Sequence, residues 1–145
     1  MKGTYLLIIE LTNNQKIQIG KLGNIFFRKG FYVYIGSSMN NLEKRINRHL
    51  SKDKKIHWHI DYLLKKAEIF ESYLKENNIK EECKLANIFL KEKLEKIAGF
   101  GCTDCNCESH LFYGRKDVIL NLISTFDMIK YKRLICFIKL KGDFV

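Results

Sequence analysis

The chain has 145 residues, the size of one domain, and its 46% hydrophobic and 12% aromatic content excludes a disordered tail. Its 26 Lys and Arg residues against 16 Asp and Glu give a net charge of +10, which is compatible with a nucleic-acid partner. Its apolar runs fall far short of the ~20 residues that span a bilayer. Five cysteines, three of them within 102–107, do not form the even framework of a secreted disulfide protein. We expect one cytoplasmic domain over residues 1–145 that is not held in a membrane.

The first predicted elements are strands. Tyr5–Leu11 is almost entirely apolar, and after an Asn-Asn turn Lys16–Ile19 alternates polar and apolar residues as a hairpin partner would. Phe31–Ile35 is rich in aromatic and β-branched residues and is predicted as a further strand. Asn40–Leu50 carries apolar residues at helical spacing and is predicted as the first helix.

The second half of the chain mixes helices and strands. Glycines 99 and 101 follow the longest helical pattern, in a position where helices commonly end. The order of elements favours an α+β fold with a small antiparallel sheet flanked by helices. The predicted elements are a helix over His57–Lys66, a strand over Glu68–Leu74, a helix over Lys80–Ala98, a strand over Leu111–Tyr113, a helix over Asp117–Ile129 and a strand over Lys132–Leu140, in which Cys136 is a core residue.

A row of aromatic residues ends the strand that precedes Gly36. The two-residue period of a strand places Tyr32, Tyr34 and Gly36 on one face and Val33 and Ile35 on the other. Phenol groups on one face could bind a ligand, or they could fill the core as aromatic residues usually do. The sequence alone leaves both interpretations open.

Basic side chains follow on the first predicted helix. Arg45 and His49 share a helical face, and a guanidinium beside an imidazole suits a phosphate group, although a surface arginine and a capping histidine are the alternative. The stretch 44–66 contains eight Lys and Arg against two acids, which suits phosphate contact but would also fit a solvated helix face. The candidate nucleic-acid contacts are Ser37, Arg48, Lys54 and Lys55.

Two further groups could carry chemistry. If 57–66 is helical, His57 and Asp61 share a face, so that Asp61 would fix the His57 tautomer; a structural histidine near a buried Trp58 is the alternative. Four potential zinc ligands crowd the polar loop that follows Gly101, a tighter spacing than structural zinc commonly uses. They are Cys102, Cys105, Cys107 and His110, and Cys83 could replace one of them. The alternative is a loop that wraps the active site, with Asn106, Ser109 and His110 at its rim.

Two short motifs resemble a known family. Gly3-Thr4-Tyr5 and Tyr34-Ile35-Gly36 resemble the paired signature of the GIY-YIG nuclease superfamily, with threonine in place of the first isoleucine. Arg45 matches the family arginine and His49 the position that holds His or Tyr. Within the superfamily the chain is most similar to the branch called domain of unknown function 123. That likeness rests on Gly36-Ser37-Ser38, Arg45–His49, His57–Tyr62 and Gly99–Leu111.

The resemblance implies metal-dependent hydrolysis of DNA phosphodiester bonds. In the superfamily a glutamate on a later helix holds Mg²⁺ or Mn²⁺, a tyrosine helps to deprotonate water, and the arginine stabilises the developing charge. Glu82 fits that glutamate because apolar residues follow it at +3 and +4, and Glu81 is the next candidate. The candidate catalytic residues are Tyr5, Tyr34, Arg45, His49 and His57.

Three functions therefore remain open. The first is a DNA endonuclease acting in repair or recombination. The second is a nucleic-acid-binding module of the same fold without catalysis, which would share the basic face but lack a carboxylate beside Tyr5 and Arg45. The third is a zinc-stabilised interaction domain with protein partners, which would bind zinc and show no salt-dependent DNA affinity.

Overall fold

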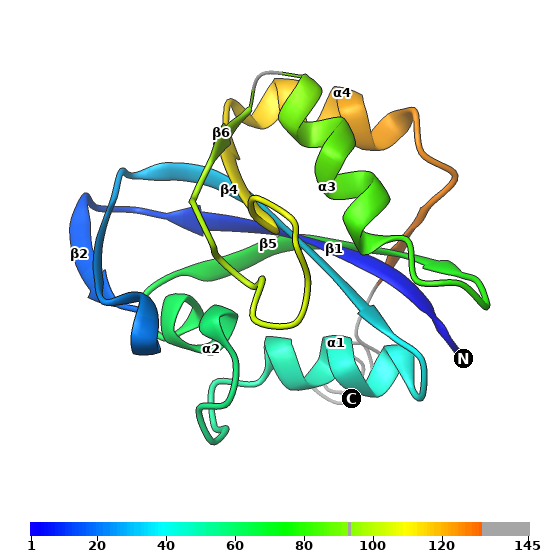
Figure 1. Cartoon of the computed structure of the whole chain (residues 1–145), viewed down its shortest axis with the longest axis horizontal. Helices are drawn as coiled ribbons and strands as arrows, with labels where there is room; N and C mark the ends of the chain where they lie inside the picture. Colours follow the sequence, from blue (N-terminus) through cyan, green and yellow to red (C-terminus); the bar gives the residue numbers. More distant parts are fainter. Residues whose placement is uncertain (93, 132–145) are drawn as a thin grey trace, which may run out of the picture.

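A six-stranded antiparallel sheet forms the centre of the protein, which the computed structural model describes over residues 1–92 and 94–131 (Figure 1). The strand order is β6-β7-β4-β1-β5-β8, and a separate hairpin joins β2 to β3. This arrangement confirms the predicted α+β class with an antiparallel sheet flanked by helices. The strands are β1 (Gly3–Leu11), β2 (Gln15–Gln18), β3 (Asn24–Phe27), β4 (Gly30–Ser38), β5 (Glu68–Glu76), β6 (Glu95–Lys96), β7 (Leu111–Gly114) and β8 (Ile129–Tyr131).

Helices cover both faces of the sheet. Figure 1 shows α1 (Leu42–Leu50) and α2 (His59–Leu64) on one side and α3 (Glu82–Lys91) and α4 (Lys116–Ser124) on the other. Each side has its own apolar core, because β1 and β4 are buried on both faces. No helix within the described part of the chain is long and apolar enough to cross a bilayer.

The two central strands confirm the predicted alternation. β1 pairs antiparallel with β4, with Tyr5 opposite Gly36. Tyr32 and Tyr34 lie in the core beneath α1 and α2, whereas Val33 and Ile35 lie in the core beneath α3 and α4. The aromatic row therefore belongs to one face of the sheet.

The strand predicted at Lys16–Ile19 exists but does not pair with β1. It forms β2 and pairs with β3, while β1 lies between β4 and β5. Both edges of β1 are filled by strands of nine residues, which offer longer ladders than a four-residue hairpin partner could. The prediction was wrong because turn residues and alternation do not exclude competition from strands further along the chain.

The longest helix is much shorter than predicted. α3 ends at Lys91, and the chain then turns so that β6 pairs with β7. Leu94, which fits a helical period, instead packs over Gly114, where an added Cβ would lie 2.3 Å from its Cδ2. Gly99 and Gly101 do not end a helix: both have positive φ, of 74° and 75°, within the loop over 99–110.

Other element ends also differ from the prediction. α2 begins at His59 and not at His57, because the Asp61 carboxylate accepts the backbone N–H groups of His57 and Trp58 before the first turn. α4 ends at Ser124, so the predicted helix to Ile129 was five residues too long. The predicted strand Lys132–Leu140, with Cys136, lies outside the described residues.

Candidate functional site

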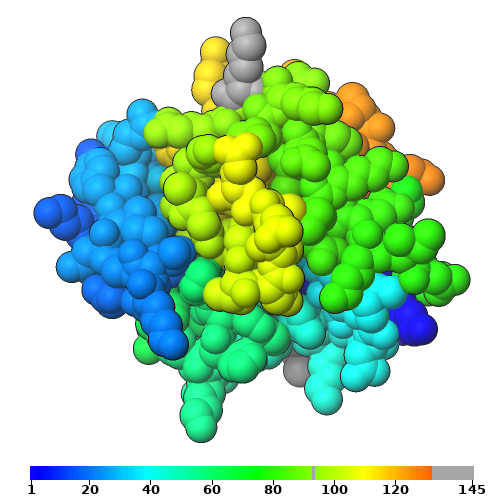
Figure 2. Space-filling view, in the orientation of Figure 1, coloured from blue at the N-terminus to red at the C-terminus, as the bar shows by residue number. Residues whose placement is uncertain are grey.

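A pocket of about 390 Å³ opens where β4 runs on past its pairing with β7. Four parts of the chain line it: the paired ends of β1 and β4, the α1–α2 region, the start of α3 and the loop over 99–110. Figure 2 shows this loop (yellow) in the middle of the face, between the segment around α3 (green) and the α1 region (cyan). Six residues of the predicted catalytic, nucleic-acid-binding and magnesium sets meet here: Tyr5, Tyr34, Ser37, Arg45, His57 and Glu82.

Tyr5 is placed in the pocket by the strand opposite it. Its ring lies directly over Gly36, where an added Cβ would approach Tyr5 Cζ to 2.3 Å. Because the contact comes from a buried ring and not from a flexible chain end, only glycine fits at this position. The two motifs therefore depend on each other: the glycine of one makes room for the tyrosine of the other.

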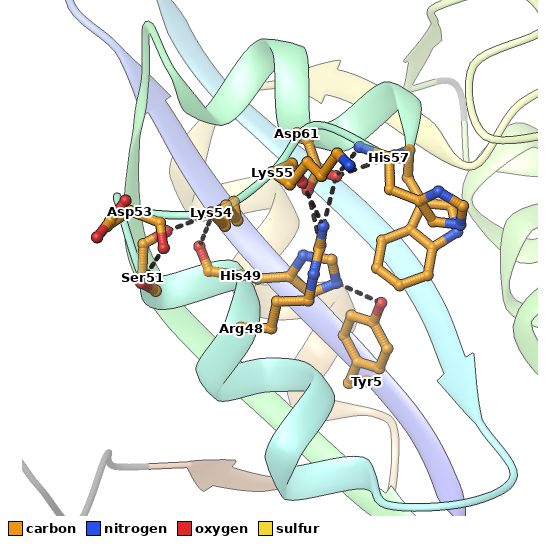
Figure 3. A network of polar contacts seen from close by, with 10 residues as sticks. Tyr5, Arg48, His49, Ser51, Asp53, Lys54, Lys55, His57 and Asp61 are labelled. Carbon is orange, nitrogen blue, oxygen red and sulfur yellow. Dashed lines mark hydrogen bonds and ion pairs between the residues drawn. The ribbon is translucent and has the colours of Figure 1, made fainter.

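A buried hydrogen bond joins Tyr5 to α1. The Tyr5 hydroxyl lies 2.7 Å from His49 Nε2, as Figure 3 shows. His49 is 2% exposed, so it does not line the pocket but lies behind Tyr5. Its Nδ1 is buried and has no partner among the described residues.

Burial sets the protonation of this pair. It lowers the pKa of His49 to about 3, although the Asp61 carboxylate opposes the shift. Burial also raises the pKa of Tyr5 and of Tyr34 well above the ordinary value for a phenol, against the lowering effect of Arg45. At neutral pH all three side chains are therefore uncharged, and the neutral imidazole can accept the phenolic proton.

Two arginines contact the same indole ring but have different partners. The guanidinium carbons of Arg45 and Arg48 lie 4.5 and 4.4 Å from the centroid of Trp58. Arg48 donates two hydrogen bonds of 3.0 Å to the Asp61 carboxylate (Figure 3). Arg45 donates to the Ser37 carbonyl at 3.3 Å and forms no ion pair within the described residues. Its positive charge is thus available to an anion in the pocket, which Lys80 also lines.

The expected role of Asp61 was wrong. Its carboxylate accepts from the backbone N–H groups of His57 and Trp58 at 2.8 and 2.9 Å, not from the His57 ring. Burial alone would raise the pKa of Asp61, but Arg48 and these N–H groups outweigh it and lower the pKa. Asp61 therefore holds α1 and the start of α2 together. The exposed His57 ring forms no hydrogen bond with this carboxylate.

Part of the basic stretch 44–66 is used inside the protein. Lys54 donates to the carbonyl oxygens of His49 and Ser51 at 2.8 and 2.5 Å, which places its charge at the end of α1. Lys52 does the same near the end of α2, at 2.9 Å from each of two carbonyl oxygens. Of the four predicted nucleic-acid contacts, Arg48 and Lys54 thus bind groups within the protein, whereas Lys55 is exposed.

Two carboxylates line the pocket, one of which the sequence did not single out. Glu82 lies in the first turn of α3, and its Oε2 is buried without a hydrogen-bond partner among the described residues. Asp104, from the loop over 99–110, is the second. The sequence allowed this loop to wrap the site but pointed to Asn106, Ser109 and His110 at its rim, so Asp104 was missed. The loop is held there by His59, whose Nδ1 accepts the Gly101 N–H at 2.9 Å.

A cluster of sulfur and imidazole ligands lies beside the pocket. One ligand atom from each of Cys83, Cys105, Cys107 and His110 lies within 4.8 Å of the others, so the group could hold a metal ion. The cluster differs from the predicted set in one residue. Cys102 is not a member, since its thiol donates to the Phe100 carbonyl at 3.4 Å, and Cys83 of α3 takes the fourth place. We call these four residues the Cys3His cluster.

The fold and this pocket define an α+β domain with a polar site at the open end of its central strands. The chain belongs to the family described as domain of unknown function DUF123, whose model matches residues 4–130. No curated protein and no solved structure matches the chain.

Proposed function

We propose that the protein is a metal-dependent endonuclease of the GIY-YIG type that hydrolyses phosphodiester bonds in DNA. The supporting observation is that two tyrosines, two carboxylates and an arginine that has no acidic partner among the described residues line one pocket. These are the groups that phosphodiester hydrolysis needs: donors to the phosphate, a proton acceptor and oxygen ligands for a cation.

Arg45 binds the scissile phosphate. Its guanidinium is positioned by the Trp58 ring and the Ser37 carbonyl before any ligand arrives, so little side-chain entropy remains to be lost. A planar guanidinium can donate two parallel hydrogen bonds to phosphate oxygens. Because negative charge on these oxygens grows in the transition state, this contact strengthens as the reaction proceeds.

Tyr5 and His49 move the proton of the attacking water. Tyr5 passes its hydroxyl proton to His49 Nε2, 2.7 Å behind it, and the phenolate oxygen takes the proton of the attacking water, while the leaving oxygen takes a proton from solvent. Burial disfavours both the phenolate and the imidazolium, so the pair is neutral at rest, and a bound cation would favour the phenolate. Tyr34, with its ring 6.4 Å from that of Tyr5, offers a second hydroxyl to the phosphate or the water.

Glu82 and Asp104 would hold Mg²⁺ or Mn²⁺. Carboxylate oxygens are the ligands these ions prefer, and the Oε2 of Glu82, buried without a hydrogen-bond partner among the residues described, is the kind of oxygen that a cation satisfies. When bound, the ion supplies Lewis-acid polarisation of the phosphodiester. The Cys3His cluster suits a different ion, Zn²⁺, because its ligands are thiols and an imidazole.

A cleavage assay tests the proposal. Labelled single-stranded, duplex, flap and branched DNA are incubated with the protein and Mg²⁺ or Mn²⁺, and nicks are scored on denaturing gels. We expect Arg45→Ala and Glu82→Gln to lose cleavage by roughly 10²-fold or more in turnover, with DNA affinity changed less. Glu81→Gln is the matched control, since Glu81 lies beside Glu82 but lines a separate cavity with Thr4 and Lys75.

The outcomes separate the candidate functions. A protein that binds DNA but nicks none of these substrates with either ion would overturn the nuclease in favour of a non-catalytic binding module. Cleavage that survives Glu82→Gln but is lost in Asp104→Asn would contradict the assigned metal ligand, not the reaction. A protein that neither binds nor cleaves DNA would leave a zinc-stabilised interaction domain.

A further inference from the structure

The Cys3His cluster joins two parts of the chain that no strand pairing connects. Cys83 lies in the first turn of α3, which packs on one face of the sheet. Cys105, Cys107 and His110 come from the loop over 99–110, which reaches α2 on the opposite face through the Gly101–His59 hydrogen bond. The four side chains thus meet at the side of the pocket, between α3 and the loop.

The ligand spacing suits a tetrahedral zinc site. Cys83 Sγ and Cys105 Sγ lie 3.8 and 3.7 Å from His110 Nε2. With Zn–S bonds of about 2.3 Å and a Zn–N bond of about 2.05 Å, a tetrahedron has S···N edges of about 3.6 Å and S···S edges of about 3.8 Å. All four ligand atoms lie within 4.8 Å of one another, so no pair has to approach by more than about 1 Å to enclose an ion.

The tip of the loop has little else to fix it. Its base is closed by backbone bonds, from Gly99 N–H to Glu108 at 2.8 Å and from His110 N–H to Phe100 at 2.9 Å. Between them, residues 102–107 bury no apolar side chain, and Thr103, Asp104 and Asn106 are exposed. Three of the four cluster ligands belong to this loop, so an ion would order a stretch that apolar packing leaves unsupported.

We infer that Cys83, Cys105, Cys107 and His110 bind one structural zinc ion that clamps the loop over 99–110 to α3. Four protein ligands fill a tetrahedral coordination shell, so the ion has no open position for a substrate or water. The ion instead positions the residues that form this side of the pocket. Glu82 precedes one ligand and Asp104 precedes another, and His110 itself lines the pocket. This inferred clamp does not depend on whether the pocket cleaves DNA.

Metal analysis with one cysteine variant at a time tests the clamp. The untagged protein is purified under reducing conditions, and its zinc is measured by mass spectrometry. We expect about one zinc per chain in the wild type. Cys83→Ser and Cys107→Ser should retain less than about a tenth of it, since each removes a thiolate ligand. Cys102→Ser is the matched control: it removes a thiol of the same loop that donates to the Phe100 carbonyl, and it should retain the full zinc content.

A second measurement uses the wild type alone, in case a variant fails to fold. Removing zinc with a chelator should lower the Tm by about 5–15 °C. It should also speed amide exchange in the loop over 99–110 and in the first turn of α3, with the β1–β4 ladder unchanged. Cobalt in place of zinc should give the spectrum of a tetrahedral thiolate site, unchanged in Cys102→Ser.

Three results would overturn the inference. A reduced wild type without zinc, whose thiols all react at once with a thiol reagent, excludes the site. Zinc that stays in Cys83→Ser but leaves Cys102→Ser would show a site within the loop and no clamp to α3. Chelation that changes neither Tm nor amide exchange would show an adventitious ion only. None of these measurements depends on DNA cleavage. A result against the nuclease can therefore be distinguished from a result against the zinc clamp.

Discussion

The Tyr5–His49 pair shows how much a single buried contact depends on residues far apart in the chain. The hydroxyl and the imidazole are 44 residues apart, yet they share a hydrogen bond of 2.7 Å because β1 and α1 pack face to face. Within the part of the chain that the structure describes, the imidazole forms no ion pair, and burial holds it neutral. A histidine in this setting couples the stability of the fold to pH.

We predict that His49 makes the protein acid-labile. The pKa of His49 is about 3 in the folded state and about 6.5 in the unfolded state, so below pH 6.5 the unfolded chain binds a proton that the folded chain does not. Its contribution to the unfolding free energy is complete above pH 6.5 and is lost as the pH falls towards 3, by up to about 4–5 kcal/mol. Urea unfolding from pH 7 to pH 4 measures the slope.

The control separates His49 from the carboxyl groups that also titrate in acid. His49→Gln keeps a hydrogen-bonding side chain and removes the titration, so its stability should change less between pH 6.5 and 4. His57→Gln, at an exposed position, should follow the wild type. Parallel curves for the wild type and His49→Gln would contradict a neutral buried imidazole.

At the scale of residues, the sequence predicted which side chains lie in the pocket better than it predicted which side chains pair with one another. The resemblance implied Tyr5, Tyr34 and Arg45 as site residues, strand and helix periods placed them on matching faces, and all three line one pocket. They could not show that Asp61 pairs with Arg48, since a pairing across two helices depends on how those helices meet. The choice of Cys83 over Cys102 has the same origin: spacing favoured the nearer cysteine, and the fold brought in the distant one.

The pairing of α1 with α2 belongs to the scale of elements. Asp61 is fully buried, and Arg48 supplies the only charge that faces it within hydrogen-bonding distance among the described residues. Arg48 also donates to the Lys55 carbonyl at 2.8 Å, so one guanidinium fixes the connection between the two helices (Figure 3). A helix of six residues such as α2 is held by such contacts and not by its own propensity.

We predict that Arg48→Ala destabilises the fold by about 2–4 kcal/mol, because it leaves a buried carboxylate with no opposite charge. Arg45→Ala is the matched control. It likewise removes a guanidinium from the Trp58 ring but leaves no acid unpaired. The loss of unfolding free energy should therefore be less than about 1 kcal/mol. Urea unfolding of both variants gives the comparison. Equal losses would mean that contact with the indole ring, and not the ion pair, stabilises the helix pair.

Elements were predicted where periodicity alone decides and missed where packing competes with it. The central strands and α1 were predicted correctly because the period of each element buries its apolar residues in one of the two cores. Leu94 and Ile97 fit a helical period, but they reach the two cores from a strand segment beside β7, and the ladder between β6 and β7 gives the backbone there its partners. Sequence periodicity could not separate the two outcomes.

Net charge acts at the scale of the whole molecule. The formal charge is +10, but charge that is neutralised within the fold does not release counterions from DNA. Of the eight basic residues in the stretch 44–66, Arg48 and Lys52 pair with acids, and the Lys54 ammonium is bound by two carbonyl oxygens at the end of α1. The other five form no ion pair within the part of the chain that the structure describes: Lys44, Arg45, Lys55, Lys65 and Lys66.

We predict that DNA binding is electrostatic and that these five residues set its salt dependence. Five phosphate contacts on duplex DNA give a slope of log affinity against log salt near −4.5. Fluorescence anisotropy with a labelled duplex, in EDTA to prevent cleavage, measures it. Lys55→Gln should make the slope shallower by about 1. Lys54→Gln should leave it unchanged, because the Lys54 ammonium is bound to the end of α1. Equal effects of the two variants, or an affinity independent of salt, would show that this stretch is not the DNA-binding surface.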